Sequence, residues 1–188
     1  ISEAIPFWRS WRKCVKGNLE PPSQNKTYVT GTDLAKYQDF TVLATLNQNG
    51  HLCGFDRFGE LDWVFQRKRI VNHCQSYQSR LLIDSTGVGD PIYDELRREQ
   101  IRVDGYKFTQ ASKADIIENL SIMIENQTIS YPDIPELIHE LELFGFTMGK
   151  TGTIQYGAPE GYHDDCVIAL ALATWQLKKP KGFFAWKY

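Results

Sequence analysis

The sequence has little cysteine, little net charge and no long apolar run. Its four cysteines are scattered without a C-x-x-C pair, which excludes the common zinc-site spacings and favours free thiols over disulfides. The formal net charge of −2 lacks the basic excess typical of chains that bind nucleic acid by charge alone. No apolar run reaches the roughly 18 residues of a membrane helix, and Arg9, Arg12 and Lys13 interrupt any signal peptide. We therefore expect a cytoplasmic protein.

Nucleotide-binding loops are also missing from the sequence. Residues 145–151 resemble a P-loop, but three residues separate Gly145 from Gly149 where the G-x-x-x-x-G-K-[ST] pattern has four. This segment follows a predicted helix instead of a strand, so we interpret it as a turn. Residues 86–90 do follow a predicted strand, but they lack the third glycine of the dinucleotide fingerprint. They are typical of a tight strand-to-helix turn.

What the sequence does contain is sufficient for one domain. With 188 residues, of which 42% are hydrophobic and 23% charged, the chain can form one sizeable core and is too short for two domains of ordinary size. Residues 1–26 carry the pair Pro21-Pro22 and no strand periodicity, and we interpret them as an appendage or a linker. The domain itself is expected over residues 27–180, followed by a C-terminal tail at residues 181–188.

Strand and helix patterns follow one another from residue 27 onward. Strands are predicted at residues 27–34, 40–46, 51–58, 80–85 and 103–109. Helices are predicted at residues 60–77, 91–100, 112–126 and 135–145 and from about residue 163, with a two-stranded ribbon at 146–157. Asn49-Gly50 is a hairpin signal, Pro91 fits the first turn of a helix, and Ser112 is the expected cap of another.

The order of these elements predicts an α/β fold. The first three strands follow one another directly and form an antiparallel meander. The later strands alternate with helices, and right-handed crossovers make such strands parallel to the first. The predicted architecture is therefore a mixed sheet, with three antiparallel strands and then parallel strands, flanked by helices and carrying an extra β-hairpin. Ligands of such sheets gather beyond the carboxyl ends of the strands.

Two aspartates stand at those carboxyl ends. Asp33 ends the first predicted strand and Asp84 ends the fourth, although aspartate is disfavoured within strands. If the two strands are parallel neighbours, both carboxylates emerge at the same edge of the sheet. Like charges within about 4 to 6 Å raise the pKa of one of them unless a cation intervenes. Mg²⁺ and Mn²⁺ are the expected cations, since hard ions prefer oxygen ligands.

A second acidic pair precedes the last predicted helix. Asp164 and Asp165 stand before a run that is apolar and rich in small residues, and this helix is expected to lie flat against the sheet. Capping of the helix would explain one of the two carboxylates without any metal. Three or four carboxylates around paired ions would instead meet the requirement of two-metal phosphoryl transfer. His163 could orient a phosphate or a water, or could have a structural role beside Tyr162.

Four motifs stand out together in the sequence. They are Gly31-Thr-Asp-Leu-Ala-Lys-Tyr-Gln-Asp-Phe-Thr41, Ile83-Asp-Ser-Thr-Gly-Val-Gly-Asp90, Ser112-Lys113 before a helix, and Gly161-Tyr-His-Asp-Asp-Cys-Val-Ile-Ala-Leu170. By their order and spacing, residues 27–178 resemble the nuclease domain of the large terminase subunit of tailed bacteriophages.

This resemblance implies a ribonuclease H-like fold and a metal-dependent endonuclease that cuts concatemeric double-stranded phage DNA during packaging, in the cytoplasm of the infected bacterium. It implies that Asp33 and Asp84 are catalytic ligands of two Mg²⁺ or Mn²⁺ ions and that residues 163–165 give the third ligand, for which we favour Asp165 over Asp164. Asp164 and His163 are then auxiliary, with Asp164 as a further metal ligand, and Asp39 acts in the outer shell. The candidate DNA contacts are Lys113, Lys150, Arg67 and Arg69.

The family's ATPase motor has no counterpart here, because the sequence contains no Walker A motif. The resemblance therefore implies that this chain corresponds to the nuclease portion only, that residues 1–26 are the tail of the connection to a preceding ATPase domain, and that no nucleotide cofactor binds. The implied partners are DNA, that motor domain, the portal and the small terminase subunit. The ribbon at residues 146–157 is similar in place to a hairpin of the family that contacts DNA or gates the site.

Two other functions remain open from the residues alone. The chain could be a Holliday-junction resolvase or an RNase H-type nuclease, which use similar carboxylate sites on junctions or RNA:DNA hybrids. It could also be a non-catalytic nucleotide-binding module of the actin-like type. The closely spaced acids argue against this last alternative, because a nucleotide site favours glycine-rich phosphate loops.

Overall fold

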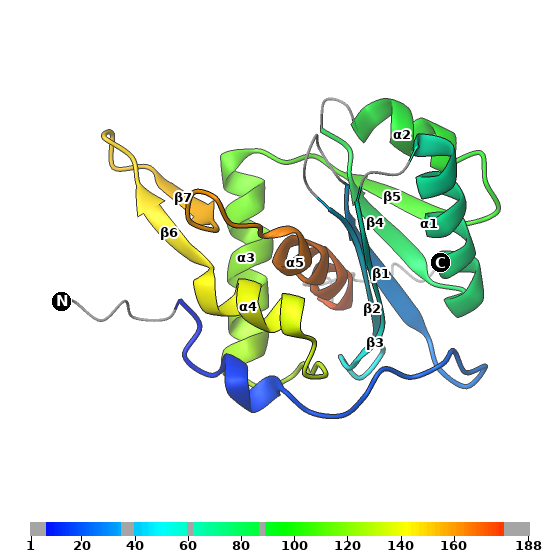
Figure 1. Cartoon of the computed structure of the whole chain (residues 1–188), viewed down its shortest axis with the longest axis horizontal. Helices are drawn as coiled ribbons and strands as arrows, with labels where there is room; N and C mark the ends of the chain where they lie inside the picture. Colours follow the sequence, from blue (N-terminus) through cyan, green and yellow to red (C-terminus); the bar gives the residue numbers. More distant parts are fainter. Residues whose placement is uncertain (1–6, 35–39, 60–61, 87–88, 179–188) are drawn as a thin grey trace, which may run out of the picture.

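A five-stranded mixed sheet forms the centre of the protein (Figure 1). The computed structural model describes residues 7–34, 40–59, 62–86 and 89–178. The strands are β1 (Tyr28–Asp33), β2 (Thr41–Asn47), β3 (Leu52–Phe58), β4 (Arg80–Asp84) and β5 (Arg102–Tyr106). They lie in the order β3-β2-β1-β4-β5. Strand β2 is antiparallel to β1 and β3, whereas β4 is parallel to β1 and β5 is parallel to β4, which confirms the predicted fold class.

The turn between β2 and β3 follows the predicted hairpin signal. Gly50 has a φ of +80°, a conformation that glycine adopts without steric cost. The side-chain oxygen of Asn47 accepts hydrogen bonds from the backbone N–H groups of Asn49 and His51. This turn therefore depends on local chemistry, which explains why sequence alone could predict it.

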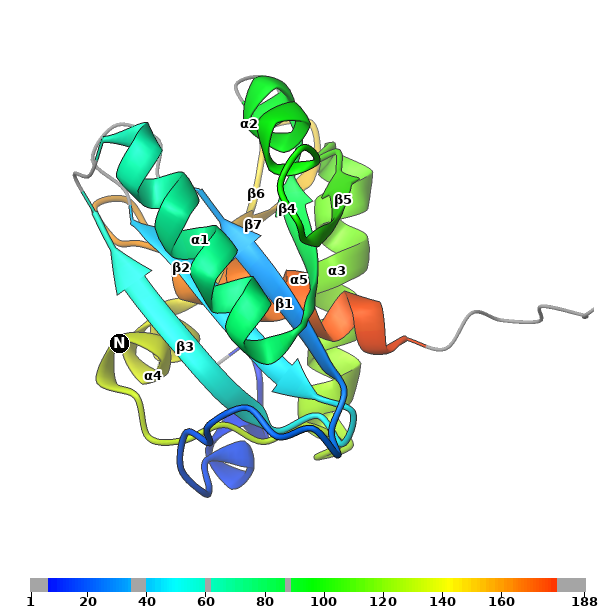
Figure 2. The ribbon, with the colours of Figure 1, turned by 90° about the vertical axis from the view of Figure 1, so that its right-hand side faces the viewer.

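Helices cover both faces of the sheet. They are α1 (Trp63–Tyr77), α2 (Gly89–Leu96), α3 (Gln110–Glu125), α4 (Pro135–Leu143) and α5 (Asp165–Leu177). Helices α1 and α2 lie on one face, and α5 lies on the other, with α3 and α4 packed outside it (Figures 1 and 2). Within the described residues, no helix combines the length and the apolar character that a membrane span requires.

Helix α3 begins earlier than predicted, and the prediction that Ser112 caps it is wrong. The N-cap is Thr109, whose extended backbone (φ −122°, ψ 173°) ends the preceding segment. The Thr109 hydroxyl accepts from the Ser112 backbone N–H, and the Ser112 hydroxyl accepts from the Thr109 backbone N–H. Ser112 is thus the third helical residue of a reciprocal capping box, a position where a serine is hard to distinguish from a cap by sequence.

Helix α5 lies directly against the strands. Its residues from Asp165 to Thr174 are all buried, so the small side chains noted in the sequence face protein on every side. A Cβ atom added to Gly31 of β1 would lie 2.1 Å from the carbonyl oxygen of Ala169 and 2.4 Å from the backbone nitrogen of Ala173. Only a glycine permits this backbone-to-backbone contact between strand and helix.

The segment before β1 is packed against the domain, although the sequence indicated an appendage or a linker. Trp8 and Trp11 are buried, the second of them in the 3-10 helix η1 (Trp11–Cys14). The Trp8 indole N–H donates to the Leu141 carbonyl at 3.0 Å, and the Tyr131 hydroxyl donates to the Trp11 carbonyl at 2.7 Å. Residues 7–15 therefore contribute to the core of the domain. The boundary at residue 26 stays a prediction, as does the tail at 181–188, which lies outside the described residues.

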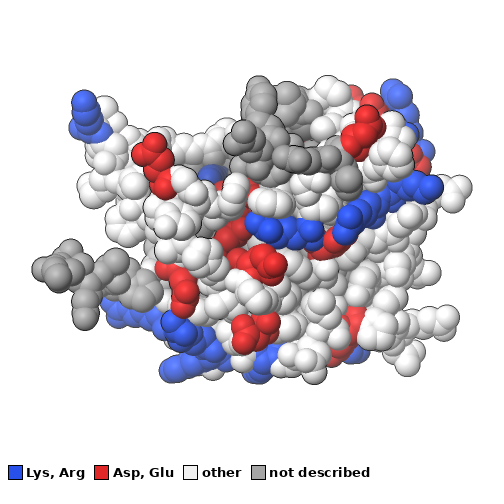
Figure 3. All heavy atoms as spheres, in the orientation of Figure 1, with Lys and Arg blue, Asp and Glu red and all other residues white. Residues whose placement is uncertain are grey.

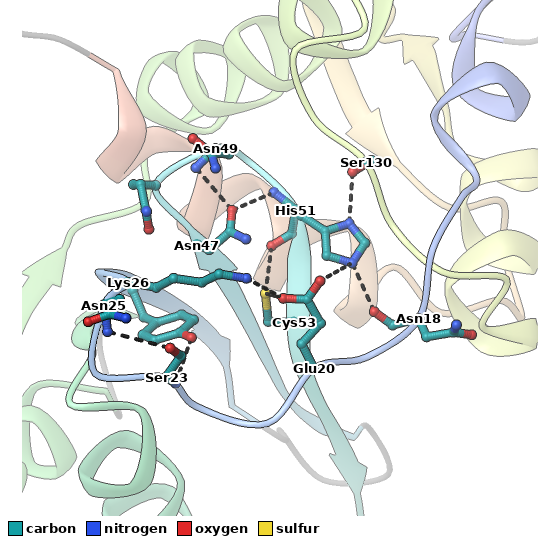
Figure 4. Close-up of polar contacts among 12 residues, drawn as sticks. Asn18, Glu20, Ser23, Asn25, Lys26, Asn47, Asn49, His51, Cys53 and Ser130 are labelled. Atoms are coloured by element: carbon teal, nitrogen blue, oxygen red, sulfur yellow. Dashed lines mark hydrogen bonds and ion pairs between the residues drawn. The ribbon is translucent and has the colours of Figure 1, made fainter.

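A polar network fastens this N-terminal segment to the outer strand β3 (Figure 4). His51 Nε2 lies 2.9 Å from the Asn18 carbonyl oxygen, so this nitrogen must donate. His51 Nδ1 lies 2.8 Å from the Ser130 hydroxyl. Glu20 accepts from Lys26 at 2.7 Å. One histidine thus joins the segment before β1, the sheet edge and the loop before α4.

The predicted ribbon and the predicted free thiols are both confirmed. Strands β6 (Gly145–Met148) and β7 (Ile154–Gly157) pair antiparallel and project from the domain (Figure 1). Residues 145–151 thus form a strand and a turn that lead to another strand, as the P-loop exclusion predicted. All four cysteines are buried and free.

Candidate active site

The first two candidate carboxylates leave the sheet at the same edge. Strands β1 and β4 are parallel neighbours, and Thr32 is paired with Ile83, so Asp33 and Asp84 follow at equivalent positions. Because side chains alternate along a strand, Asp33 points to the same face as Gly31, which contacts α5. The expectation that the two strands are adjacent and parallel is confirmed.

Asp84 is held by the turn that follows it. Its side chain is buried, and its Oδ1 atom accepts from the backbone N–H of Thr86 at 2.8 Å. The Thr86 hydroxyl in turn accepts from the Phe108 backbone N–H at 2.6 Å. The segments that follow β4 and β5 therefore fix the orientation of this carboxylate, which is the kind of support that a catalytic or metal-binding group requires.

Asp165 is anchored to the start of β2. Its Oδ2 atom accepts from the Phe40 backbone N–H at 3.2 Å and lies 3.6 Å from Nδ1 of His163. The His163 ring packs edge-on against the Phe40 ring, with centroids 5.3 Å apart. The side chain of Asp165 is 8% exposed whereas that of His163 is 41% exposed, so the histidine forms the solvent side of this cluster.

Asp164 is the N-cap residue of α5, but its side chain does not cap the helix. Its Oδ2 atom lies 3.7 Å from the Lys113 ammonium. The cap comes from α4, where Glu140 Oε2 accepts from the backbone N–H groups of Cys166 at 2.7 Å and Val167 at 3.1 Å. The alternative that capping explains one of the two aspartates is therefore not supported for Asp164, whose side chain makes no cap hydrogen bond.

Glu140 is an unusual residue for its position. It is buried, and this burial raises the pKa of its carboxyl group to about 7, with the nearby Asp165 charge adding to the rise against the lowering effect of the two N–H donors. The sequence did carry a signal for it. Leu137, Glu140 and Leu141 follow the spacing of a core-facing helix stripe, and an acid at such a position needs an explanation.

Four carboxylates and one ammonium line a single cavity of about 290 Å³. The lining residues are Asp33, Asp84, Asp164, Asp165 and Lys113, with Leu34, Thr86, Phe108 and Ile168. The carboxylate set fits a hard divalent cation, because oxygen ligands are what Mg²⁺ and Mn²⁺ prefer and the like charges repel without one. In this structure no three acid, histidine or cysteine side chains of the described residues are grouped closely enough to hold one ion together.

The remaining candidates lie elsewhere. Asp39 is outside the described residues. Lys150 is exposed in the turn between β6 and β7. Arg67 and Arg69 lie on α1 and do not line the cavity; Arg67 pairs with Glu95 at 3.0 Å and Arg69 forms two hydrogen bonds of 2.6 Å with Asp56. Their role as DNA contacts stays a prediction, and it requires these ion pairs to be shared or broken.

Comparison with known proteins supports the resemblance to phage terminases. No family model matches the chain. The large terminase subunit of Thermus phage G20c is 27% identical over 182 residues, which cover 95% of this chain and 37% of that relative. This chain therefore spans little more than a third of the relative's length.

Solved structures match over most of the described domain. The crystal structure of the large terminase nuclease from the thermophilic phage G20c has a TM-score of 0.83 at 23% identity and covers 91% of this chain and 98% of that chain. The same nuclease with bound magnesium has a TM-score of 0.79 at 28% identity, covering 84% and 85%, and further structures of it hold cobalt or zinc. The resemblance predicted from the motifs is confirmed: in sequence and in fold, this chain is similar to the nuclease domain of phage large terminase subunits, with its ribonuclease H-like architecture.

Proposed function

We propose that this chain is a metal-dependent endonuclease that hydrolyses phosphodiester bonds of double-stranded DNA. The observation that carries the proposal is the single cavity in which the carboxyl ends of β1 and β4 meet the N-terminus of α5, with a carboxylate from each. The similar G20c nuclease binds magnesium, which supports a divalent ion as the cofactor.

Asp33, Asp84 and Asp165 would hold the ions, with Asp164 as an auxiliary ligand. Two bound Mg²⁺ or Mn²⁺ ions supply activation of a water and stabilisation of the leaving oxygen. The chain's own residues fix the geometry: the Phe40 N–H orients Asp165 and the Thr86 N–H orients Asp84. Such orientation by neighbouring donors determines where a ligand oxygen can stand.

Lys113 is the cation best placed to contact the DNA backbone. It lines the same cavity as the carboxylates, and its side chain is 34% exposed. An ammonium at this position can pair with a phosphate oxygen that enters the cavity. His163, exposed at the rim beside Asp165, is placed to orient a water or a phosphate.

The resemblance to terminases supports a specific setting for this reaction. The substrate would be concatemeric phage DNA in the cytoplasm of an infected bacterium, cut as packaging begins and ends. A motor domain, the portal and the small terminase subunit would be its partners in the full assembly. The formal net charge is only −2, and on the face drawn in Figure 3 Lys and Arg side chains lie beside Asp and Glu. Because the chain has no basic excess, it should bind DNA weakly by itself and rely on these partners for retention.

A plasmid assay tests the proposal. The purified chain should convert supercoiled plasmid to nicked and linear forms with Mn²⁺ or Mg²⁺, and a chelator should stop the conversion. Asp84→Asn should lower the rate by at least about a hundredfold, because it removes a metal ligand. Asp104→Asn is the matched control, since Asp104 stands on the neighbouring strand β5, exposed and paired with Arg80; it should cut at the wild-type rate.

Three outcomes would contradict the proposal. Undiminished cutting by Asp84→Asn, with its fold intact by circular dichroism, would exclude this cavity as the active site. Faster cleavage of a four-way junction or an RNA:DNA hybrid than of duplex DNA would favour the resolvase or RNase H-type alternative. Tight ATP binding by calorimetry, with no cleavage of any substrate, would favour the nucleotide-binding module.

A further inference from the structure

We propose that Glu140 is a positioning residue for the carboxylates of the active site. By capping α5 from a neighbouring helix, it keeps the side chains of Asp164 and Asp165 directed to the cavity. The consequence of this inference for catalysis rests on the proposed function. The effect of Glu140 on metal binding by the aspartates, however, can be measured without any DNA cleavage.

The start of a buried helix has backbone donors that need acceptors. The first N–H groups of an α-helix have no partner within the helix, and the side chain of the N-cap residue is the usual acceptor. In α5 the N-cap is Asp164, whose side chain makes no such bond. Glu140 accepts from both Cys166 and Val167 instead.

The location of Glu140 indicates that a gain in stability does not by itself explain why a glutamate occupies this position. The residue stands between Leu137 and Leu141 on the buried face of α4, where an apolar side chain would pack. Its Oε1 atom is buried without a hydrogen-bond partner among the described residues. Burying a carboxylate in this way costs free energy, and local choices that oppose stability are expected at functional sites.

Loss of Glu140 would leave the Cys166 and Val167 N–H groups without their acceptor. The nearest substitute is the Asp164 carboxylate, because an N-cap aspartate can accept from these same positions of its own helix. Asp164 would then turn away from Lys113 and from the cavity. Asp165 is the next residue in the chain, so a turn of Asp164 would also displace the Asp165 carboxylate. This displacement would strain its hydrogen bond from the Phe40 backbone N–H.

Calorimetric titration with Mn²⁺ tests this relation in the whole chain. Glu140→Ala should weaken Mn²⁺ binding by about tenfold or more, as for other residues that support metal ligands. Glu140→Gln should keep most of the affinity, because its amide oxygen can accept the same two hydrogen bonds although its charge is gone. Leu141→Ala is the matched control for stability: it should lower the melting temperature and leave Mn²⁺ affinity at the wild-type value.

Each contrary result has a distinct meaning. Wild-type Mn²⁺ affinity in Glu140→Ala would overturn the inference and leave Glu140 a structural cap. Equal loss in Glu140→Gln and Glu140→Ala would also overturn it, since the charge and not the hydrogen bonds would then matter. If the variants behave as expected but the wild-type chain cuts no DNA, the proposed function fails while the positioning of the metal site stands. If the wild-type chain binds no Mn²⁺, both are overturned.

Discussion

The two faces of the central sheet are built by opposite means. On the α5 face, helix and strand meet backbone to backbone at Gly31, and the contacting helix side chains are small and apolar. On the α1 face, an apolar cluster that includes Ile70 and Cys74 of α1 is joined by buried polar side chains that bridge helix and sheet. The Thr45 hydroxyl lies 2.7 Å from His73 Nε2 of α1 and 2.7 Å from the Thr30 hydroxyl, which also donates to Ser79.

The carboxylates of the candidate site stand on the tightly packed face. Alternation along β1 and β4 directs Asp33 and Asp84 toward α5, and α5 itself carries Asp165. A site that needs several ligands in fixed relative positions benefits from a contact that leaves no room for sliding. A face joined through side-chain contacts permits more adjustment than a backbone-to-backbone contact, because side chains can shift. The comparison teaches that close packing and function coincide on one face of this sheet.

Among the substitutions that test this comparison, that of Gly31 should lower the free energy of unfolding the most. Gly31→Ala places a methyl group 2.1 Å from a carbonyl oxygen and 2.4 Å from an amide nitrogen of α5, and backbone atoms cannot move aside as a side chain can. We expect the free energy of unfolding to fall by about 3 kcal/mol or more, together with loss of DNA cleavage as α5 lifts from β1. Urea unfolding followed by circular dichroism measures the change.

Gly145→Ala is the control for that experiment. A Cβ at Gly145 would meet nothing within 4 Å, so the same chemical change should leave stability within about 0.5 kcal/mol of wild type. If Gly31→Ala unfolds at the same urea concentration as this control, the α5 face is not the rigid one and the comparison does not hold.

Substitution of Gly54, on the α1 face, should have a smaller effect. Gly54 pairs with Thr45 in the sheet, and a Cβ there would lie 2.9 Å from Cε2 of the Tyr77 ring. The ring can tilt, although its hydroxyl is bonded to the Glu20 carbonyl at 2.7 Å. We expect Gly54→Ala to lower the free energy of unfolding by about 1 kcal/mol, since the strain is relieved through a side chain. A loss as large as that of Gly31→Ala would show both faces to be equally rigid.

The same distinction between local and distant contacts explains what the sequence could predict. The strands, most helix positions and the Asn49-Gly50 turn depend on periodicity and local chemistry. The convergence of Asp33 and Asp84 needed one further step, the rule that crossover strands are parallel. These features could therefore be derived without coordinates.

What could not be predicted depends on partners far away in the chain. Trp8 gives no local sign that it packs against α4. Glu140 stands out only by its core-facing spacing, and its partner at Cys166 is 26 residues away. Arg69 looked available for DNA because its pairing with Asp56 on β3 is invisible in a linear pattern. Sequence periodicity describes each element by itself, whereas these contacts exist only after the elements are assembled.

The smallest expected effect is a pH dependence on the α1 face. Burial lowers the pKa of His73 below its ordinary value of 6.5, against a weaker raising effect of the Asp56 charge. As pH falls through about 6.5, the unfolded chain therefore takes up a proton that the folded chain resists, and the free energy of unfolding decreases; above this range the contribution of His73 is constant.

His73→Gln removes the proton site, so the stability difference between wild type and variant should be more favourable to wild type at pH 8 than at pH 5. Urea unfolding of both proteins at the two pH values measures this difference, in which the other titrating groups cancel. An identical difference at pH 5 and pH 8 would mean that water reaches His73 on this face freely enough to solvate its charge, and the α1 face would then be looser still than its hydrogen bonds indicate.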